Sequence, residues 1–408
     1  MDGKHGASRR QMLLGGLGGA AVVAGLARPS IASAAVTPAA VSPDPVRRAY
    51  AFLSAKFDEF GSGSDLRVPR SYTGGFFQTP TWDFVSSFAY DDALVIMAWL
   101  AGGDVRRATI LGDTLLYAQE HDPIGDGRTR ASYQPDSFTT LNGSLDIGSP
   151  AAFTGNQAWV GMAFAHLYAR TRQKRFLEGA LAEAEWIQDR TYDVVRAPYG
   201  YTGGRNAADE PNTFKATEHN IDVGAFFTML ASLTGRPVWR QRARVAFGFV
   251  EAMQDASDGH LWTGTDPDGV TTNTRPIPED VQTWAYLATL DRRYSRSVDW
   301  TLANLAATDA GITGVSYSDA DVSKVWLEGT AQTALALRAR GSAKAARPLL
   351  AAIEKAQATT EHGDGRGIPA ASSDGLDTGF GDLYHASLHT GATAWYLLAA
   401  KGWNPFRL

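Results

Sequence analysis

The 408-residue chain contains no cysteine. Disulfide bonds, thiolate metal sites and a cysteine nucleophile are therefore excluded. A large excess of one charge is also missing, since the chain has 38 basic and 43 acidic residues and a net charge of −5. The sequence shows no basic stripe either, which argues against a nucleic-acid-binding protein. With 44% hydrophobic residues, the chain has ample apolar material for a folded core.

Histidine is scarce as well, with eight residues scattered along the chain. His385 and His389 have the spacing of a zinc-binding helix, but Ala386 stands where a metalloprotease has its glutamate. The stretch 266–269 lacks the distal glutamate of a calcium-binding EF-hand and is typical of a turn. No phosphate-binding loop, dinucleotide fingerprint or nucleophile elbow is present. We therefore expect neither a metal nor a cofactor.

Long apolar runs are missing except near the N-terminus. There Arg9 and Arg10 precede a Gly/Ala-rich stretch to about Ala27, and 32–34 offers the small residues that signal peptidase cuts. The stretch is shorter than the ~20 residues needed to span a bilayer. The pattern predicts a twin-arginine signal peptide over 1–34, a linker over 35–43 and one domain over 44–408. We expect a secreted or otherwise extracytoplasmic monomer without a membrane anchor after cleavage.

Beyond the linker, apolar residues recur with helical periodicity in twelve segments. These helices are predicted at 44–60, 87–102, 104–119, 155–170, 173–190, 217–234, 236–254, 279–290, 294–308, 325–340, 342–357 and 384–401. The even-numbered helices are followed by linkers of a few residues, as at Gly235 and Gly341. The odd-numbered helices are followed by long loops.

This alternation predicts the fold. A short linker forces two helices to lie antiparallel, so strict alternation places all the long loops at one end of the molecule. Six such hairpins closing into a ring form an all-α (α/α)6 toroid. The spacing between hairpins is too irregular for a tetratricopeptide array, which repeats every 34 residues.

Each long loop leads into the start of an even-numbered helix, and these starts are rich in carboxylates, amides and indoles. A single carboxylate at a helix N-terminus is explained by the helix dipole, worth ~0.3–1 kcal/mol. The dipole does not explain why Trp, Gln and Asn accompany the acids within one turn. We therefore expect the even helices to line the inside of the ring and to point these groups at one cavity. The starts are Tyr90-Asp91-Asp92-Ala93-Leu94, Gly155-Asn156-Gln157-Ala158-Trp159, Thr217-Glu218-His219-Asn220-Ile221-Asp222, Glu279-Asp280-Val281-Gln282-Thr283-Trp284, Trp326-Leu327-Glu328-Gly329-Thr330-Ala331-Gln332 and His385-Ala386-Ser387-Leu388-His389-Thr390.

This layout resembles the six-hairpin glycosidases, which are inverting (α/α)6-barrel glycoside hydrolases. Four motifs are similar to those of a group of exported, glycosidase-like bacterial proteins, and the resemblance runs from about residue 44 to the end. It implies a hydrolase acting on a polysaccharide or oligosaccharide. In several six-hairpin glycosidases the base comes from the last long loop, which draws attention to Asp377. The motifs are Tyr90-Asp91-x-Ala93-Leu94, Thr217 to Asp222, Glu328 to Gln332 and Gly391 to Tyr396.

Glycosidic bond hydrolysis by inversion needs a protonated carboxyl and an ionised carboxylate ~6.5–9.5 Å apart. Glu218 is the first candidate for the acid, because Asp222 lies one turn later and a like charge raises a carboxyl pKa. Glu328 and Asp91 are the other catalytic candidates. A capping or structural role remains the alternative for each of the three.

Sugars have flat apolar faces and many hydroxyls, so a binding site needs indoles together with amides, acids and imidazoles. The expected substrate-binding residues are Trp159, Gln157, His219, Asn220, Asp222, Asp280, Gln282, Trp284, Trp326, Asp377 and His389. Trp82 and Trp262 also fall in long loops, although a core position is the alternative for several of these indoles.

Three other functions fit the same fold. A polysaccharide lyase would use a Tyr or His base such as Tyr90 or His219, but it would need a basic cleft, and the motifs carry acids. A sugar epimerase would use His385 or His389 as a proton shuttle, and a non-catalytic glycan-binding protein needs no such group. In each case the partner is a carbohydrate.

Overall fold

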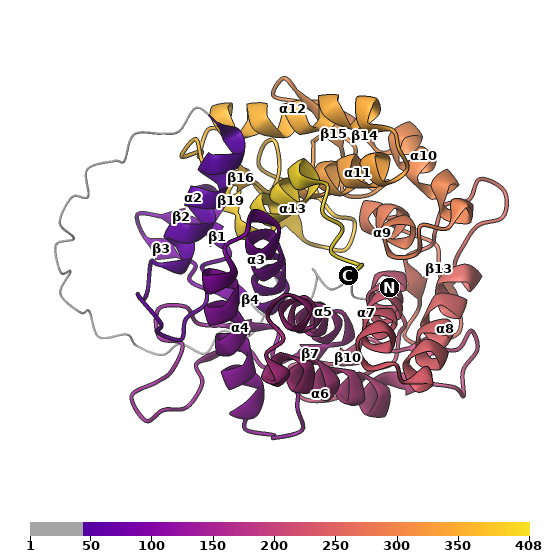
Figure 1. Ribbon diagram of the computed structural model, residues 1–408. Coiled ribbons are helices and arrows are strands. Elements are labelled where there is room, and N and C mark those ends of the chain that lie inside the picture. Colours follow the sequence, from indigo (N-terminus) through magenta and orange to yellow (C-terminus); the bar gives the residue numbers. More distant parts are fainter. Residues whose placement is uncertain (1–43) are drawn as a thin grey trace.

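The computed structural model describes residues 44–408, which form a ring of helical hairpins (Figure 1). The predicted signal peptide (1–34) and linker (35–43) lie outside the described residues. Six helices form an inner ring in which each contacts the next and the last contacts the first. The all-α (α/α)6 toroid is therefore confirmed. The inner helices are α3 (Ala89–Gly102), α5 (Thr154–Thr171), α7 (Thr217–Thr234), α9 (Glu279–Thr289), α11 (Leu327–Ala339) and α13 (Thr390–Lys401).

The other six helices surround this ring. Inner and outer helices differ in how much of their surface is buried. In α3 every residue from Ala89 to Trp99 is buried, as expected for a helix with neighbours on all sides. The outer α6 instead buries one stripe that includes Phe176, Ala180 and Ile187. The outer helices are α2 (Pro45–Phe57), α4 (Val105–Glu120), α6 (Lys174–Thr191), α8 (Pro237–Ala252), α10 (Ser295–Asn304) and α12 (Ala343–Thr359). Among residues 44–408 no helix combines the length and apolar character that a membrane span requires.

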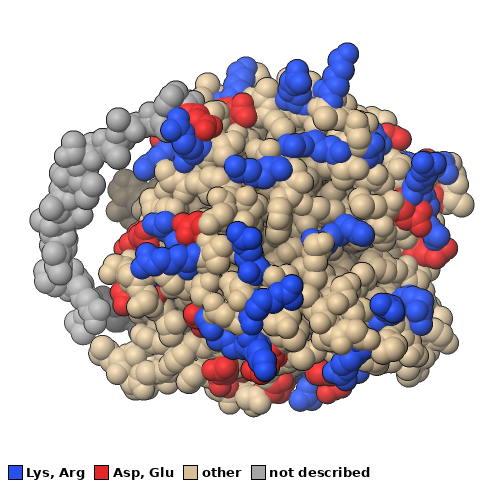
Figure 2. Space-filling model, in the orientation of Figure 1, with Lys and Arg blue, Asp and Glu red and all other residues tan. Residues whose placement is uncertain are grey.

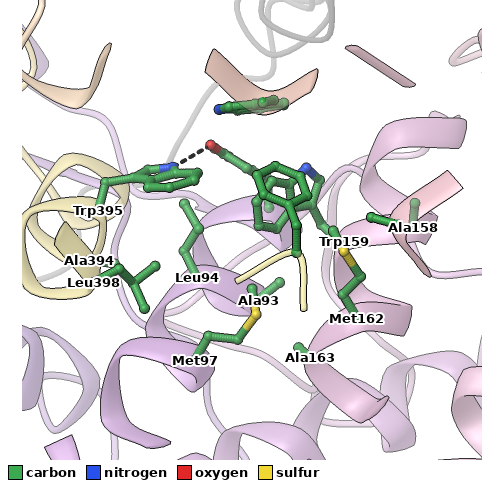
Figure 3. Packing of buried hydrophobic residues seen from close by; sticks show 14 of the residues in the cluster. Ala93, Leu94, Met97, Ala158, Trp159, Met162, Ala163, Ala394, Trp395 and Leu398 are labelled. Carbon is green, nitrogen blue, oxygen red and sulfur yellow. Dashed lines mark hydrogen bonds between the residues drawn. The ribbon is translucent and has the colours of Figure 1, made fainter. Parts of the chain in front are cut away.

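Large aromatic side chains fill the centre of the ring. The rings of Trp159 and Trp284 are 5.3 Å apart, and those of Trp159 and Trp395 are 5.9 Å apart. Phe406, in the C-terminal tail, packs 5.1 Å from Trp159 at the short-linker end. Figure 3 shows Trp159 and Trp395 above the small or flexible side chains of Ala93, Met97 and Met162. The ring is thus a packed core and has no open channel along its axis.

The long loops form a second ring at the other end, made of short strands and single bridges. Each loop pairs with the next: β4 (Ser87–Phe88) with β5 (Ser132–Tyr133), and β7 (Ala152–Phe153) with β10 (Gly204–Arg205). Isolated bridges then join 216 to 264, 278 to 318 and 326 to 371. β19 (Leu388–His389) closes the circle on β1 (Tyr72–Thr73). This pairing fixes the loops over the inner helix starts.

The remaining strands extend these pairs or form hairpins inside single loops. β6 (Ile147–Ser149) pairs with β5, β11 (Pro211–Asn212) with β10, and β16 (Ile368–Pro369) with β19. The local hairpins are β2 (Gln78–Thr79) with β3 (Trp82–Asp83), β8 (Tyr192–Asp193) with β9 (Gly200–Tyr201), β12 (Gly264–Thr265) with β13 (Thr272–Asn273), β14 (Ala306–Asp309) with β15 (Ile312–Val315), and β17 (Leu376–Asp377) with β18 (Leu383–Tyr384).

The last predicted helix, 384–401, is wrong at its start. The chain is extended at Leu388–His389, whose backbone pairs with both β1 and β16, and α13 begins only at Thr390. His385 and His389 therefore do not share a helix face, and the zinc-like spacing has no structural counterpart. The backbone partners come from loops far away in the sequence, so helical periodicity could not reveal them.

His166 connects the C-terminal tail to α5. Its Nε2 lies 3.0 Å from the carbonyl oxygen of Pro405. Burial lowers the pKa of His166 from 6.5 to about 4. Between these two pH values the unfolded chain binds a proton that the folded chain does not. The free energy of unfolding should therefore fall as the pH drops from 6.5 to 4.

We expect this loss to reach up to ~3 kcal/mol and to be smaller in a His166→Gln variant. Thermal melts from pH 7 to pH 4 on both proteins measure it, and Gln keeps an N–H for the Pro405 carbonyl. Identical pH dependence in the two proteins would contradict the assignment of this acid sensitivity to His166.

Candidate active site

The first turns of four inner helices carry carboxylates at the long-loop end. Asp91 begins α3, Glu218 begins α7, Asp280 begins α9 and Glu328 begins α11. All four are buried, and Glu218 is the most exposed of them at 4%. The ring topology therefore brings to one end of the molecule residues that are far apart in the sequence.

Glu218 lines a narrow pocket between the starts of α7 and α9. The cavity volume is about 10 Å³, which is room for a single water molecule. His219 lies beside the carboxylate, with its Nε2 3.5 Å from Glu218 Oε1. The other three carboxylates do not line this pocket. Its walls include Phe214, Thr263, Asn273, Pro278, Val281 and Tyr317.

A second group of polar residues joins α3, α11 and α13 around His389. Its Nε2 lies 3.1 Å from Asp91 Oδ2, and its Nδ1 accepts the Ala392 N–H at 3.2 Å. The ring proton is thus on Nε2, pointing at Asp91. Nδ1 also lies 3.6 Å from Glu328 Oε2. His389 therefore stands between two of the predicted catalytic carboxylates.

Glu328 is held by further hydrogen bonds. The Tyr90 hydroxyl donates to its Oε1 at 2.7 Å, and the Gln332 amide donates to the same oxygen at 3.2 Å. Trp395 in turn donates its indole N–H to the Tyr90 oxygen at 2.8 Å, the dashed bond in Figure 3. The hydroxyl links the polar helix starts to the aromatic core and fixes the Glu328 carboxylate in one orientation.

Glycines in the inner helix starts make room for these groups. A Cβ on Gly391 would lie 2.5 Å from Asp91 Oδ1, and one on Gly155 would lie 2.6 Å from the His219 ring and 3.2 Å from Asp222 Oδ2. The two contacts under 3 Å would force the Asp91 carboxylate or the His219 ring to move. The glycine in each motif is therefore required by the polar side chain of the neighbouring helix.

Three amides predicted to bind substrate serve the fold instead. Gln157 accepts the Thr129 N–H at 2.9 Å and donates to the Thr129 carbonyl at 2.8 Å. Gln282 makes the same two bonds to Leu261, each at 2.8 Å. Asn220 accepts the Tyr201 N–H at 2.8 Å and donates to its carbonyl at 3.0 Å. Each amide pairs with the backbone of a long loop and so holds that loop against an inner helix start.

Replacing Asn220 by Leu should lower the free energy of unfolding by about 2–4 kcal/mol, because the Tyr201 N–H and carbonyl would stay buried without partners. Urea unfolding measures this loss. The matched control is Gln241→Leu on the exposed face of α8, which should change stability by less than ~0.5 kcal/mol. Equal stability of the two variants would contradict the role of Asn220 in holding the loop.

Three of the predicted sugar-binding indoles belong to the core. Trp159, Trp284 and Trp326 are fully buried. Trp326 packs in a second aromatic cluster over the long-loop end, with its ring 5.1 Å from Tyr317. Trp262 is half-buried and Trp82 is 39% exposed. Trp159 and Trp284 thus fill the centre of the helix ring and Trp326 fills the loop cluster, so these three indoles are packed away from solvent.

The remaining predicted residues lie in different surroundings. Asp222 is buried against α5 at Gly155, and Asp280 accepts the N–H of Val281 at 2.8 Å. Asp377 is exposed on the β17–β18 hairpin, where it accepts the Gly379 N–H at 2.8 Å. In the same hairpin, burial raises the pKa of Asp382 to about 6.

Of the residues that line the Glu218 pocket, sequence reasoning predicted Glu218 alone as a site residue. Two of those that it missed are polar groups from distant loops. Tyr317 and Asn273 come from separate long loops and reach the pocket through the strand pairing around the ring. Neither stands in a helix-start motif, so no sequence pattern marks them.

One group in residues 44–408 has the geometry to hold a metal ion. Asp255, Asp258 and His260 offer ligand atoms within 4.8 Å of one another, in the loop after α8. The His260 ring nitrogen Nδ1 is already paired with Asp258. None of the three lines the Glu218 pocket.

The sequence matches no protein-family model and no curated protein. Solved structures are similar in fold. A glycosidase in complex with glucose is 15% identical, with a TM-score of 0.61 over 88% of this chain and 96% of that one. A glycoside hydrolase family 76 mannosidase from Bacteroides thetaiotaomicron is 13% identical, with a TM-score of 0.58 over 88% and 98%. A D-mannose isomerase is 12% identical, with a TM-score of 0.63 over 91% and 99%.

Proposed function

We propose that the chain is a carbohydrate-active enzyme, and specifically a glycoside hydrolase of an oligosaccharide or polysaccharide. The observation that carries this proposal is the set of carboxylates at the long-loop end, with Glu218 lining a pocket beside Tyr317. The fold shared with glycosidases supports it. Hydrolysis of a glycosidic bond needs two carboxyl groups, and the inner helix starts supply them.

In the proposed mechanism Glu218 protonates the leaving oxygen, since it is the catalytic candidate that lines the pocket. Asp91 or Glu328 activates the water. His389 holds Asp91, and Tyr90 with Gln332 holds Glu328, so either carboxylate keeps a fixed orientation. Known ligand pockets have volumes of ~300–1,000 Å³. The loops that line the narrow Glu218 pocket must therefore open to admit a sugar.

Digestion of a glycan panel followed by mass analysis tests the reaction class. Hydrolysis adds one water per bond and creates a reducing end. A product with ultraviolet absorbance from a new double bond would instead identify a lyase, and an unchanged panel would contradict a hydrolase.

The stereochemical outcome is a separate expectation. Glu218 projects from α7, whereas Asp91 and Glu328 project from α3 and α11, so acid and base stand on different helices and would approach the bond from different sides. We therefore expect inversion at the anomeric carbon. Proton NMR of the first-formed product reads its configuration directly. A product with the configuration of the substrate would contradict the assignment of Glu218 with Asp91 or Glu328.

Isomerisation of a free sugar is the second candidate function. His389 beside Asp91 and His219 beside Glu218 provide imidazoles next to carboxylates, which proton transfer at carbon requires. The similarity to a D-mannose isomerase points in the same direction. Conversion of an aldose into a ketose of unchanged mass would identify this activity and replace the hydrolase proposal.

We also propose export through the twin-arginine pathway, on the basis of Arg9 and Arg10 before the apolar stretch. Replacing both by Lys should keep the protein inside the producing cell, as immunoblots of cell and medium fractions would show. Unchanged export would contradict this signal.

A further inference from the structure

The end of the ring opposite the proposed active site is basic. We call it the short-linker face and define it by the short linkers, the first turns of the outer helices and the last turns of the inner helices. Figure 2 looks onto the end where the C-terminal tail crosses the ring in Figure 1. Lys and Arg are spread over this view, while Asp and Glu are fewer and lie mostly near its margin.

Many of these Lys and Arg residues lie in the first turns of the outer helices, where a positive charge is unfavourable for the helix. The N-terminus of a helix is the positive end of its dipole and favours acidic side chains. None of the six outer helices has an acid in its first turn. Each instead has an exposed basic residue there: Arg47, Arg106, Lys174, Arg240, Arg296 and Lys344. Arg47 pairs with Asp44, and Arg296 donates to the Ser257 carbonyl at 2.6 Å. The other four make no such contact among residues 44–408, and local helix stability would select the opposite charge, so these four point to a role outside the fold.

Further cations lie in the linkers and at the inner helix ends. Arg170, Arg236 and Arg292 are exposed, and none of them forms an ion pair with an acid of residues 44–408. Asp44, Asp104 and Asp291 do lie on this face, but each accepts a backbone N–H at a helix start and pairs with a neighbouring arginine. The acids here are thus engaged as caps, and most of the cations face solvent.

The Lys and Arg residues are spread over the whole short-linker face, and this arrangement favours a flat partner. The cations come from all six hairpins around the ring, so a linear polymer would meet only a band of them, whereas a flat anionic surface meets them together. Two exposed apolar side chains lie among these cations: Leu290 is 41% and Leu408 is 50% exposed. A cavity of about 520 Å³ lies at the C-terminal tail, lined by His166, Arg170, Trp403 and Arg407. Cations with an amphipathic Trp and exposed Leu suit a lipid headgroup region.

We propose that the short-linker face docks on a bilayer containing anionic phospholipids, which leaves the long-loop end with Glu218 facing away from the membrane. The proposal does not depend on which reaction the enzyme catalyses. Attraction arises from many Lys and Arg side chains close to the surface, so it weakens as added salt shortens the screening length.

The test is sedimentation of the protein with phosphatidylcholine vesicles that do or do not contain phosphatidylglycerol. The test variant changes Arg170, Arg236, Arg292 and Lys344 to Glu. The control variant changes four basic residues from the long-loop side, Arg190, Arg275, Lys324 and Arg366, to Glu and so has the same net charge. Thermal melts check that each variant is folded, and Gln replacements at the same positions are used for any variant that is not.

We expect binding to the phosphatidylglycerol vesicles alone, a loss of affinity of more than about a hundredfold in the test variant, and little change in the control variant. Equal losses in both variants would overturn the proposal, because net charge and not this face would then matter. Binding to soluble polygalacturonate or heparin without binding to vesicles would also overturn it, in favour of a linear polyanion.

Discussion

A Glu218→Gln variant is expected to lose about 10²–10⁴-fold in glycoside hydrolysis while keeping its melting temperature. Gln has nearly the size of Glu, but it neither ionises nor donates a proton as an acid. Glu218 lines the narrow pocket, and His219 Nε2 lies 3.5 Å from its Oε1. The substitution therefore removes acid catalysis and leaves the packing of α7 intact. Initial rates on the substrate found in the glycan panel measure the effect.

The matched control is Glu120→Gln at the exposed end of α4. It should keep full activity and full stability. If Glu218→Gln instead kept normal turnover, Glu218 would not be the acid. If it lost its melting transition, the carboxylate would have a structural role in the start of α7.

Trp284→Ala should be the most destabilising single change in the aromatic core, by about 3–5 kcal/mol. The indole is fully buried and lies 5.3 Å from Trp159, 6.1 Å from Trp395 and 5.6 Å from Phe406. Its removal leaves a cavity where three helices and the tail meet. Typical stabilities are 5–15 kcal/mol, so this loss is a large share of the total. Urea denaturation at neutral pH gives the change.

Trp82→Ala provides the contrast, because this indole is 39% exposed in a long loop. It should lower the free energy of unfolding by only about 1 kcal/mol, because the indole packs against Phe76 and Phe84 but is not enclosed. A Trp284→Ala protein of normal stability with a raised KM would show that Trp284 binds substrate, as the sequence suggested, and that the core assignment is wrong.

The sequence predicted the architecture because its signals are local and periodic. Apolar spacing identifies each helix from its own residues, and the alternation of short and long linkers orders the helices into antiparallel pairs. The same logic placed Asp91, Glu218, Asp280 and Glu328 at one end. It did not extend to the start of α13, because Leu388–His389 is held extended by strands that are distant in the sequence.

Only the tertiary structure decided which group each polar side chain of the site contacts. A motif such as Thr217 to Asp222 does not tell whether Asn220 meets a sugar or the Tyr201 backbone, since the motif does not encode the path of the loop that carries Tyr201. The indoles at 159 and 284 could equally face solvent or the ring axis, and the need to fill the centre of six helices placed them inside.

The basic face was hidden from the sequence for a related reason. No stretch of the chain is strongly basic, because each hairpin contributes only a few cations at its short linker. Sequence analysis therefore found no basic stripe. Folding into a ring turns all these linkers to one end, and the helix starts of the outer ring add their cations to the same surface. The sequence by itself determined which residues are charged and which segments are helical. Only the closure of the ring decided which charges act together, because charges reinforce one another through space and not along the chain.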